Sequence, residues 1–312
     1  MVTRVTTLQS SNTMLDYIMN TESHYNELAQ QSSSGLRVDE PSDDPVATKS
    51  ILSINAEINE LNNYINSMVT AQSEIDIVDD SLASLTNLIQ EASDYATQAA
   101  NGTYTTEDLA NIKTQVDQII QSVVDLANTD YNGKHVFSGT ATSTEPYSIT
   151  YDLNGNITDV TYNGTTSNEY ERYVTISEGV SVAINLRGND VFGSYDSSTS
   201  TATGLLGDLV TLSNALDAGD TATINSCIDS LDTDLDTATT SRTKLAAVTN
   251  RFDLTKSTLD STITTLTGYR SELRDADLTE VLTNLALAET ALQATYQVTS
   301  KLMGSATLLD YI

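Results

Sequence analysis

One long apolar repeat constrains the fold of this chain more than any other feature. Between residues 51 and 99, apolar side chains recur at alternating steps of three and four positions. Fourteen of the fifteen positions are apolar: Ile51, Ile54, Ile58, Leu61, Ile65, Met68, Gln72, Ile75, Val78, Leu82, Leu85, Ile89, Ala92, Ala96 and Ala99. This spacing predicts a helix that packs along another helix, as in a coiled coil. About 50 residues of helix extend for about 80 Å, which is too long for a compact ball.

A second helix is predicted directly after this one. Asn101-Gly102 is a helix-ending pair, and Thr105 or Thr106 with Glu107 and Asp108 resembles a helix start. The same apolar spacing then continues from Leu109 to Leu126. The short connection predicts a hairpin of two helices.

The middle of the chain has a different period. From Val136 to Leu186 several segments alternate between polar and apolar residues, and the pairs Asn154-Gly155 and Asn163-Gly164 lie between such segments. Alternation with Asn-Gly pairs is typical of β-hairpins. We therefore expect a small antiparallel β domain over residues 136–203, with residues 194–203 as a polar connector.

Helical spacing returns at Leu205, breaks at Gly219-Asp220, and continues close to the end of the chain. Both chain ends are predicted to be amphipathic helices with one apolar face each. In the N-terminal helix this face contains Leu8, Leu15, Ile18, Tyr25 and Leu28. In the C-terminal helix it contains Leu278, Val281, Leu285, Leu292, Leu302 and Leu309.

These patterns predict a mainly α-helical protein with a β insert. The N- and C-terminal regions are expected to form a long antiparallel coiled-coil rod, with the small antiparallel β domain in the middle. The expected divisions are an N-terminal assembly helix at 1–40, rod helices at 41–135 and 204–275, the insert at 136–203, and a C-terminal assembly helix at 276–312.

Between the first two helices lies the segment Pro41-Ser42-Asp43-Asp44-Pro45. Both prolines prevent helix continuation, and they bias the residues before them toward extended backbone. Asp43 or Asp44 can cap the following helix, with Pro45 at its first position. We interpret this segment as a structural turn and not as a ligand site.

Charge and composition argue against several functions. The 43 acidic and 14 basic residues give a net charge of −29, which disfavours binding to nucleic acid or to anionic membranes. The single Cys227 and two histidines leave little material for a metal or redox site. Asp232, Asp234 and Asp236 alternate as in a calcium loop, but they lack its glycine and are expected to form a solvated acidic face. We expect no catalytic residue, cofactor or metal.

Three segments carry a resemblance to a known family. Residues 35–47, Gly-Leu-Arg-Val-Asp-Glu-Pro-Ser-Asp-Asp-Pro-Val-Ala, resemble the segment after the first helix of bacterial flagellins. Residues 273–280, Leu-Arg-Asp-Ala-Asp-Leu-Thr-Glu, resemble the other end of flagellins. Residues 133–140, Gly-Lys-His-Val-Phe-Ser-Gly-Thr, are similar to the hook-associated members of the family, as are the first and last few residues.

The resemblance implies a structural subunit at the junction between flagellar hook and filament, secreted unfolded through the flagellar type III apparatus. Implied partners are hook-associated protein 1, flagellin, other copies of the chain in a ring, and an export chaperone that binds the C-terminal helix. The terminal helices are then expected to order on assembly, because isolated helices are marginal in water.

Three other functions stay open at this stage. Filament flagellin itself is the nearest alternative, and the segment at 133–140 disfavours it. A helical adhesin or toxin stalk would use similar rods without the Pro-Ser-Asp-Asp-Pro turn. An enzyme is the most distant alternative.

Overall fold

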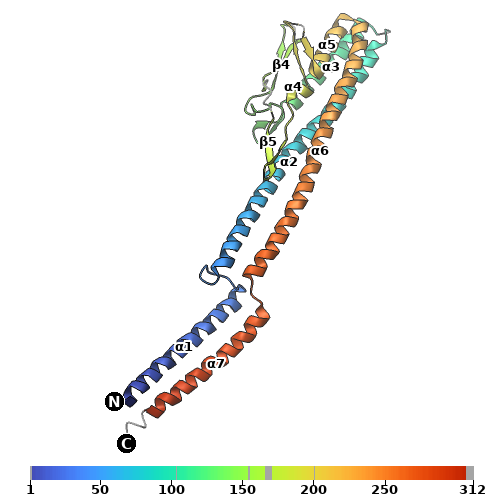
Figure 1. Cartoon of the computed structure of the whole chain (residues 1–312). Helices are drawn as coiled ribbons and strands as arrows, with labels where there is room; N and C mark the ends of the chain where they lie inside the picture. The colour runs from blue at the N-terminus through green and yellow to red at the C-terminus, as the bar shows by residue number, and fades with distance from the viewer. Residues whose placement is uncertain (1, 103, 154, 166–170, 200, 307–312) are drawn as a thin grey trace. The chain divides into compact units, whose positions relative to one another are not determined.

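The computed structural model describes residues 2–102, 104–153, 155–165, 171–199 and 201–306, without the side chains of residues 2–8, 10 and 302–306. The described chain is mainly helical, with short strands between the third helix and the fifth (Figure 1). It divides into two compact units. One unit joins the two ends of the chain, residues 1–60 and 261–312, and the other comprises residues 61–260.

The unit made from the chain ends contains two pairs of helices. Helix α1 (Val2–Ser34) packs against α7 (Leu278–Ala306), and the two run side by side in Figure 1. The start of α2 (Pro45–Ala100) lies beside the end of α6 (Thr221–Arg274), where the Arg270 Nη1 atom donates to Asn55 Oδ1 at 3.1 Å. Asp277 caps α7 by accepting from the backbone nitrogen atoms of Thr279 and Glu280.

The larger unit is built around the antiparallel packing of α2 and α6. Gln72 on α2 donates a hydrogen bond to Thr249 on α6. Arg242 on α6 donates to Asp79 on α2. The second contact lies seven residues further along α2 and seven residues earlier along α6. This seven-residue offset is the coiled-coil period that the sequence predicts. The buried α2 side chains include Met68, Ile75, Val78, Leu82, Leu85 and Ile89.

Two shorter helices, α3 and α5, also belong to this unit. Helix α3 (Thr106–Ala127) starts at Thr105, which forms a reciprocal capping box with Asp108. Helix α5 (Gly204–Ala218) packs against α3 and ends at Gly219, whose left-handed backbone (φ 67°) suits glycine. Asp220 then caps α6 by accepting from Ala222 and Thr223. Both helix boundaries agree with the sequence prediction.

The described residues between α3 and α5 form three antiparallel sheets. The largest has the order β3 (Tyr147–Tyr151), β4 (Ile157–Tyr162), β7 (Ser194–Asp196) and β8 (Thr201–Thr203). The others pair β1 (Asp130–Tyr131) with β2 (Lys134–His135), and β5 (Tyr173–Ser177) with β6 (Val180–Ala183). A short helix, α4 (Gly188–Val191), follows β6.

The predicted fold class is confirmed: long helices from the N- and C-terminal regions pack in pairs, with small antiparallel sheets in the middle of the chain. The prediction that 194–203 is only a polar connector is wrong. Residues 194–196 and 201–203 are strands, and Val160 of β4 pairs with Tyr195 of β7. Main-chain hydrogen bonds to neighbouring strands hold these segments in the sheet, and the pattern of side chains along a segment does not reveal such bonds.

The prediction that Asp232, Asp234 and Asp236 all lie on a solvated face is wrong for Asp234. Asp232 and Asp236 are exposed, but Asp234 is buried, with 7% of its surface accessible. Asp234 lies three residues after Leu231 and four before Ala238, both of which are buried. Helical spacing therefore places its carboxyl group on the inward face of α6.

Candidate assembly interface

The seam between α1 and α7 is a small apolar cluster. Leu28 of α1 meets Val281 and Ala288 of α7, and these three side chains are buried. Tyr25 and Leu285 pack against them and are half-buried. Because Val281, Leu285 and Ala288 follow steps of four and three, they share one face of α7. The apolar faces predicted for the two terminal helices thus pack against each other in this cluster.

The other residues predicted for these two faces differ in exposure. Ile18 and Leu292 are half-buried, whereas Leu15 is 53% exposed and Leu278 is 48% exposed. The side chains of Leu8 and Leu302, and all of Leu309, lie outside the described residues. The described seam is therefore deepest at the end where α1 finishes and α7 begins.

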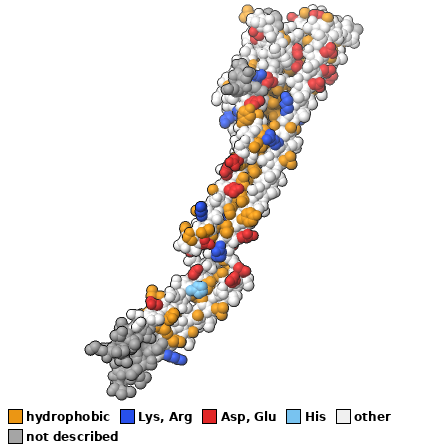
Figure 2. Space-filling view, viewed as in Figure 1, with side chains coloured by type: hydrophobic (Ala, Val, Ile, Leu, Met, Phe, Trp, Pro, Cys, Tyr) orange, Lys and Arg blue, Asp and Glu red, His pale blue; other side chains and the backbone are white. Residues whose placement is uncertain are grey.

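Several exposed apolar residues flank the seam and are absent from the predicted set. On α7, Leu282 is 54% exposed and Leu287 is 64% exposed. Successive helical residues are rotated by about 100°, so Leu282 and Leu287 lie on opposite flanks of the face centred on Val281 and Leu285. The further members of this group are Tyr17 and Met19 on α1, and Tyr296 and Val298 on α7. Figure 2 shows hydrophobic side chains on the visible face of this helix pair.

A signal for these flanking residues exists in the sequence. Helix α7 carries leucine at 278, 282, 285, 287 and 292, which is more than a single stripe can hold. A helix that is apolar on several faces is typically covered on several faces. Helix α1 covers only one of them, so the flanks of α7 are left in contact with solvent in the free chain.

The turn between α1 and α2 is held by its two aspartates. Asp43 Oδ2 accepts from the backbone nitrogen atoms of Glu40 at 2.8 Å and Asp39 at 3.0 Å. These two bonds, that of Glu40 first, hold the pKa of Asp43 below its ordinary value. Asp44 Oδ1 accepts from Val46 at 3.1 Å and Ala47 at 2.9 Å, and it is therefore the N-cap of α2.

The prolines frame this turn as the sequence suggests. Pro45 is the first residue of α2, where its missing N–H is not needed. Pro41 and Ser42 are exposed, and the Ser42 hydroxyl donates to Glu40 Oε2 at 3.3 Å.

The loop before the turn is attached to the connection between α6 and α7. The backbone nitrogen atoms of Arg37 and Val38 both donate to the carbonyl oxygen of Arg274, at 2.7 and 3.2 Å. Ala276 in turn donates to the carbonyl oxygen of Gly35 at 3.0 Å. Val38 is buried with Ala47 and Ile51, and Leu273 packs against them. The two segments with flagellin-like sequence are thus bound to each other by main-chain hydrogen bonds.

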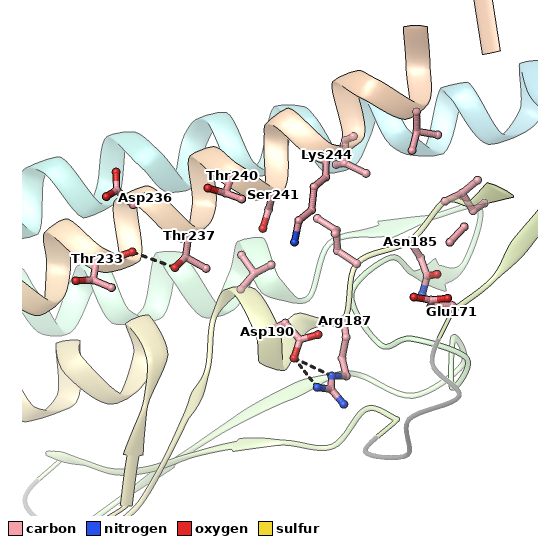
Figure 3. A pocket seen from close by; sticks show the side chains of 16 residues that line it. Glu171, Asn185, Arg187, Asp190, Thr233, Asp236, Thr237, Thr240, Ser241 and Lys244 are labelled. Carbon is pink, nitrogen blue, oxygen red and sulfur yellow. Dashed lines mark hydrogen bonds and ion pairs between the residues drawn. The ribbon is translucent and has the colours of Figure 1, made fainter. Parts of the chain in front are cut away.

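A cavity of about 470 Å³ lies between α6 and the segment around α4 (Figure 3). Arg187 in its wall is paired with Asp190, and the Thr237 hydroxyl donates to the backbone of Thr233 within α6. Its described lining contains no histidine or cysteine, and so no nucleophile with an adjacent histidine base.

No group of three or more His, Cys, Asp or Glu side chains among the described residues is arranged to hold a metal ion. None of the described helices is both long enough and apolar enough to cross a membrane. The paired terminal helices and their attached turn are therefore the candidate functional surface. Together with the long packed helices, they define a helical structural protein.

Comparison with known families identifies the class. Residues 5–142 match the bacterial flagellin N-terminal helical region, and residues 228–312 match the bacterial flagellin C-terminal helical region. The chain belongs to the bacterial flagellin family, whose members are structural proteins of the flagellum and not enzymes. The resemblance seen in the sequence is confirmed.

Individual relatives refine this assignment. The chain is 25% identical to flagellar hook-associated protein 3 of Escherichia coli (strain K12), over 92% of this chain and 93% of the relative. Flagellin FlaB1 of Treponema pallidum (strain Nichols) is 27% identical over only 37% of this chain and 41% of its own length. The full-length similarity groups the chain with the hook-associated proteins of the extracellular flagellum.

Solved structures share the fold. The flagellar hook-associated protein 3 of Legionella pneumophila superposes with a TM-score of 0.59 at 16% identity, covering 72% of this chain and 98% of that one. FlgL of Bacillus cereus superposes with a TM-score of 0.55 at 20% identity, covering 70% of this chain and 99% of that one. The larger part of this chain therefore shares its fold with these two structures.

Proposed function

We propose that this chain is a structural subunit of the hook–filament junction that polymerises through α1 and α7. In this proposal, copies of the chain form a ring that joins hook-associated protein 1 on the hook side to flagellin on the filament side. The single observation that carries the proposal is the set of exposed apolar flanks on the paired terminal helices.

The energetics of these flanks favour association. Leu282 and Leu287 are more than half exposed, as are Leu15, Tyr17 and Met19 on the partner helix. Burying an exposed leucine fully is worth roughly 1.5–3 kcal/mol. Contiguous exposed apolar surface on a protein typically marks an interaction site. Several such residues on each subunit supply enough free energy to hold neighbouring subunits together.

The experiment separates assembly from folding. The double variant Leu282→Asp, Leu287→Asp places charges on the exposed flanks and leaves the seam residues Leu28 and Val281 unchanged. In a bacterium that relies on this chain for its junction, we expect the double variant to lose filament attachment and swimming. Its circular dichroism and melting temperature should match those of the unmodified chain.

Thr290→Asp is the matched control, because Thr290 is exposed on α7 and lies about 180° around the helix from the face of Val281 and Leu285. This variant should assemble and swim normally. Normal filament attachment by the double variant would refute the proposed interface. Equal loss in the Thr290→Asp variant would show that any added charge on α7 is harmful, which would also refute it.

Filament flagellin is the second candidate function, favoured by the partial similarity to FlaB1. Immunogold labelling of isolated flagella distinguishes the two. Label confined to the hook–filament boundary supports the junction, and label along the filament supports flagellin.

Before assembly, we propose that an export chaperone covers the C-terminal helix, in particular Leu278, Val281, Leu285 and Leu292. In the folded chain Val281 and Leu285 pack against α1, so a chaperone that binds them must displace α1. Amide exchange on the free full-length chain tests this. Fast exchange across residues 278–306 supports capture of an accessible helix, whereas slow exchange rejects it.

A further inference from the structure

The cavity between α6 and the segment around α4 is lined by a hydroxyl group that the fold itself does not use. Ser241 on α6 has only 6% of its surface accessible, and its hydroxyl forms no hydrogen bond with any described residue. Thr237, four residues earlier, differs because its hydroxyl donates to the carbonyl oxygen of Thr233 at 3.0 Å. A buried hydroxyl without a partner costs free energy. Ser241 therefore offers a hydrogen bond to a molecule in the cavity.

A second lining group with no partner is an ammonium group. Lys244 belongs to none of the ion pairs among the described residues. Ser241 and Lys244 are three residues apart, so they share one face of α6. In Figure 3 the Ser241 hydroxyl and the Lys244 ammonium group both point away from α6, toward the segment that carries Arg187 and Asp190. The two groups can therefore contact the same ligand.

The other charged groups of the lining limit the charge that a ligand can carry. Asp190 accepts from Arg187 Nε at 3.1 Å, so the charges of this pair offset each other. Glu171 and Asp236 add two further negative charges to the lining. Among the described lining residues, Lys244 is thus the cation without an ion-pair partner. Because the whole chain carries a net charge of −29, these surroundings favour a single negative charge over a multiply charged anion.

Much of the remaining wall is apolar. The apolar side chains in the described lining include Ile184, Leu186, Val191, Leu245 and Val248. The volume of about 470 Å³ falls in the range of small-molecule sites, which are mostly apolar and carry a few convergent polar groups. The cavity therefore suits a ligand with one anionic end and one apolar end.

We propose that this cavity binds a small monocarboxylate with a short apolar chain. The Ser241 hydroxyl and the Lys244 ammonium group donate to the carboxylate, and the apolar chain lies against Val191, Leu245 and Val248. Hydrogen bonds with an ionised partner are about twice as strong as neutral ones. Since α6 and the segment around α4 form the two walls, the bound acid contacts both of them.

The test is a ligand-observed NMR titration of the full-length chain with sodium hexanoate. An acid of this size with one charged contact is expected to bind with a dissociation constant of about 1 mM. Hexanamide has a similar shape without the charge, and it should bind about tenfold more weakly. Equal affinity for the two molecules, or no binding of hexanoate well above the expected dissociation constant, would overturn the proposal.

Two variants locate the site. Lys244→Gln and Ser241→Ala should each weaken hexanoate binding about tenfold. Lys244 is exposed, so Lys244→Gln keeps the test decisive if Ser241→Ala does not fold. The circular dichroism of Lys244→Gln should match that of the unmodified chain. Unchanged hexanoate affinity in Lys244→Gln would refute the assignment.

Arg251→Gln is the matched control, because it removes one positive charge from an exposed position on α6, seven residues after Lys244 and outside the described lining. This variant should bind hexanoate as the unmodified chain does. Equal weakening in Arg251→Gln and Lys244→Gln would show a general attraction between charges and would overturn the site.

Sedimentation velocity distinguishes a free acid from a carboxylate side chain of a second copy of this chain. For a free acid, the unmodified chain and Lys244→Gln should sediment alike, with or without hexanoate. A larger species that hexanoate dissociates and that Lys244→Gln lacks would assign the carboxylate to a second copy. That result would overturn the binding of a free acid.

Discussion

Replacing Asp44 by alanine tests whether one side chain fixes where α2 begins. Asp44 Oδ1 accepts hydrogen bonds from Val46 at 3.1 Å and from Ala47 at 2.9 Å. These two N–H groups belong to the first turn of α2, where no carbonyl group of the helix can accept from them. Asp44→Ala leaves both without their protein acceptor, whereas Asp44→Asn keeps a side-chain oxygen in the same place.

The expected magnitude follows from the cap. Loss of an Asp or Asn N-cap destabilises a helix end by about 1 kcal/mol, which corresponds to a factor of about five in the local opening equilibrium. The second interaction of Asp44 is weaker: its Oδ2 atom lies 3.7 Å from Arg37 Nη1, and both side chains are partly exposed. An exposed pair of this kind contributes about 0–1 kcal/mol, so Asp44→Asn should remain close to the unmodified chain.

The assay is amide exchange of peptides that contain residues 41–51. We expect exchange in Asp44→Ala to be about fivefold faster than in Asp44→Asn. The peptides from the seam of α1 and α7 should be unchanged in both variants, which controls for global unfolding. Equal exchange in the alanine and asparagine variants would show that the cap does not determine the start of α2, and would refute the reasoning.

Two further predictions concern the turn and the sheet. The pKa of Asp43 is lowered in the folded chain, so the hydrogen bonds of its carboxylate stabilise the turn above about pH 4 and are lost as the pH falls through the folded pKa. The amide protection factors of Asp39 and Glu40 should therefore fall in acid in the unmodified chain. They should not fall in Asp43→Asn. Gly193→Ala should lower the melting temperature more than Gly155→Ala does. Both glycines have positive φ, but an added Cβ at Gly193 would lie 1.7 Å from the Thr203 carbonyl oxygen and one at Gly155 would meet nothing.

The helices of this protein are largely encoded by local rules. The stripe from Ile51 to Ala99, the helix start at Thr105 and the helix break at Gly219-Asp220 could be recognised from residue spacing and residue type. Helix periodicity and capping depend on residues within four positions of each other, so the sequence alone contains the information. The same holds for the Pro-Ser-Asp-Asp-Pro turn, whose hydrogen bonds span at most four residues.

The polar strands β7 and β8 could not be predicted in this way. Each is only three residues long, Ser-Tyr-Asp and Thr-Ala-Thr, which is too short for apolar alternation to indicate a strand, and β7 is a strand because β4 lies beside it. The partner strand comes from more than 30 residues earlier in the chain. Such pairing is a property of the assembled sheet and not of the segment itself.

The candidate interface was likewise predicted only in part from the sequence. From sequence alone, both chain ends could be assigned amphipathic faces, with Leu28, Val281 and Leu285 among the residues of those faces. Only the tertiary structure shows which apolar residues are buried between α1 and α7. It also shows that Leu282 and Leu287 remain exposed beside these residues. The physical reason is that helical spacing determines which side chains share a face, whereas the choice of what packs against that face depends on contacts between residues far apart in the sequence.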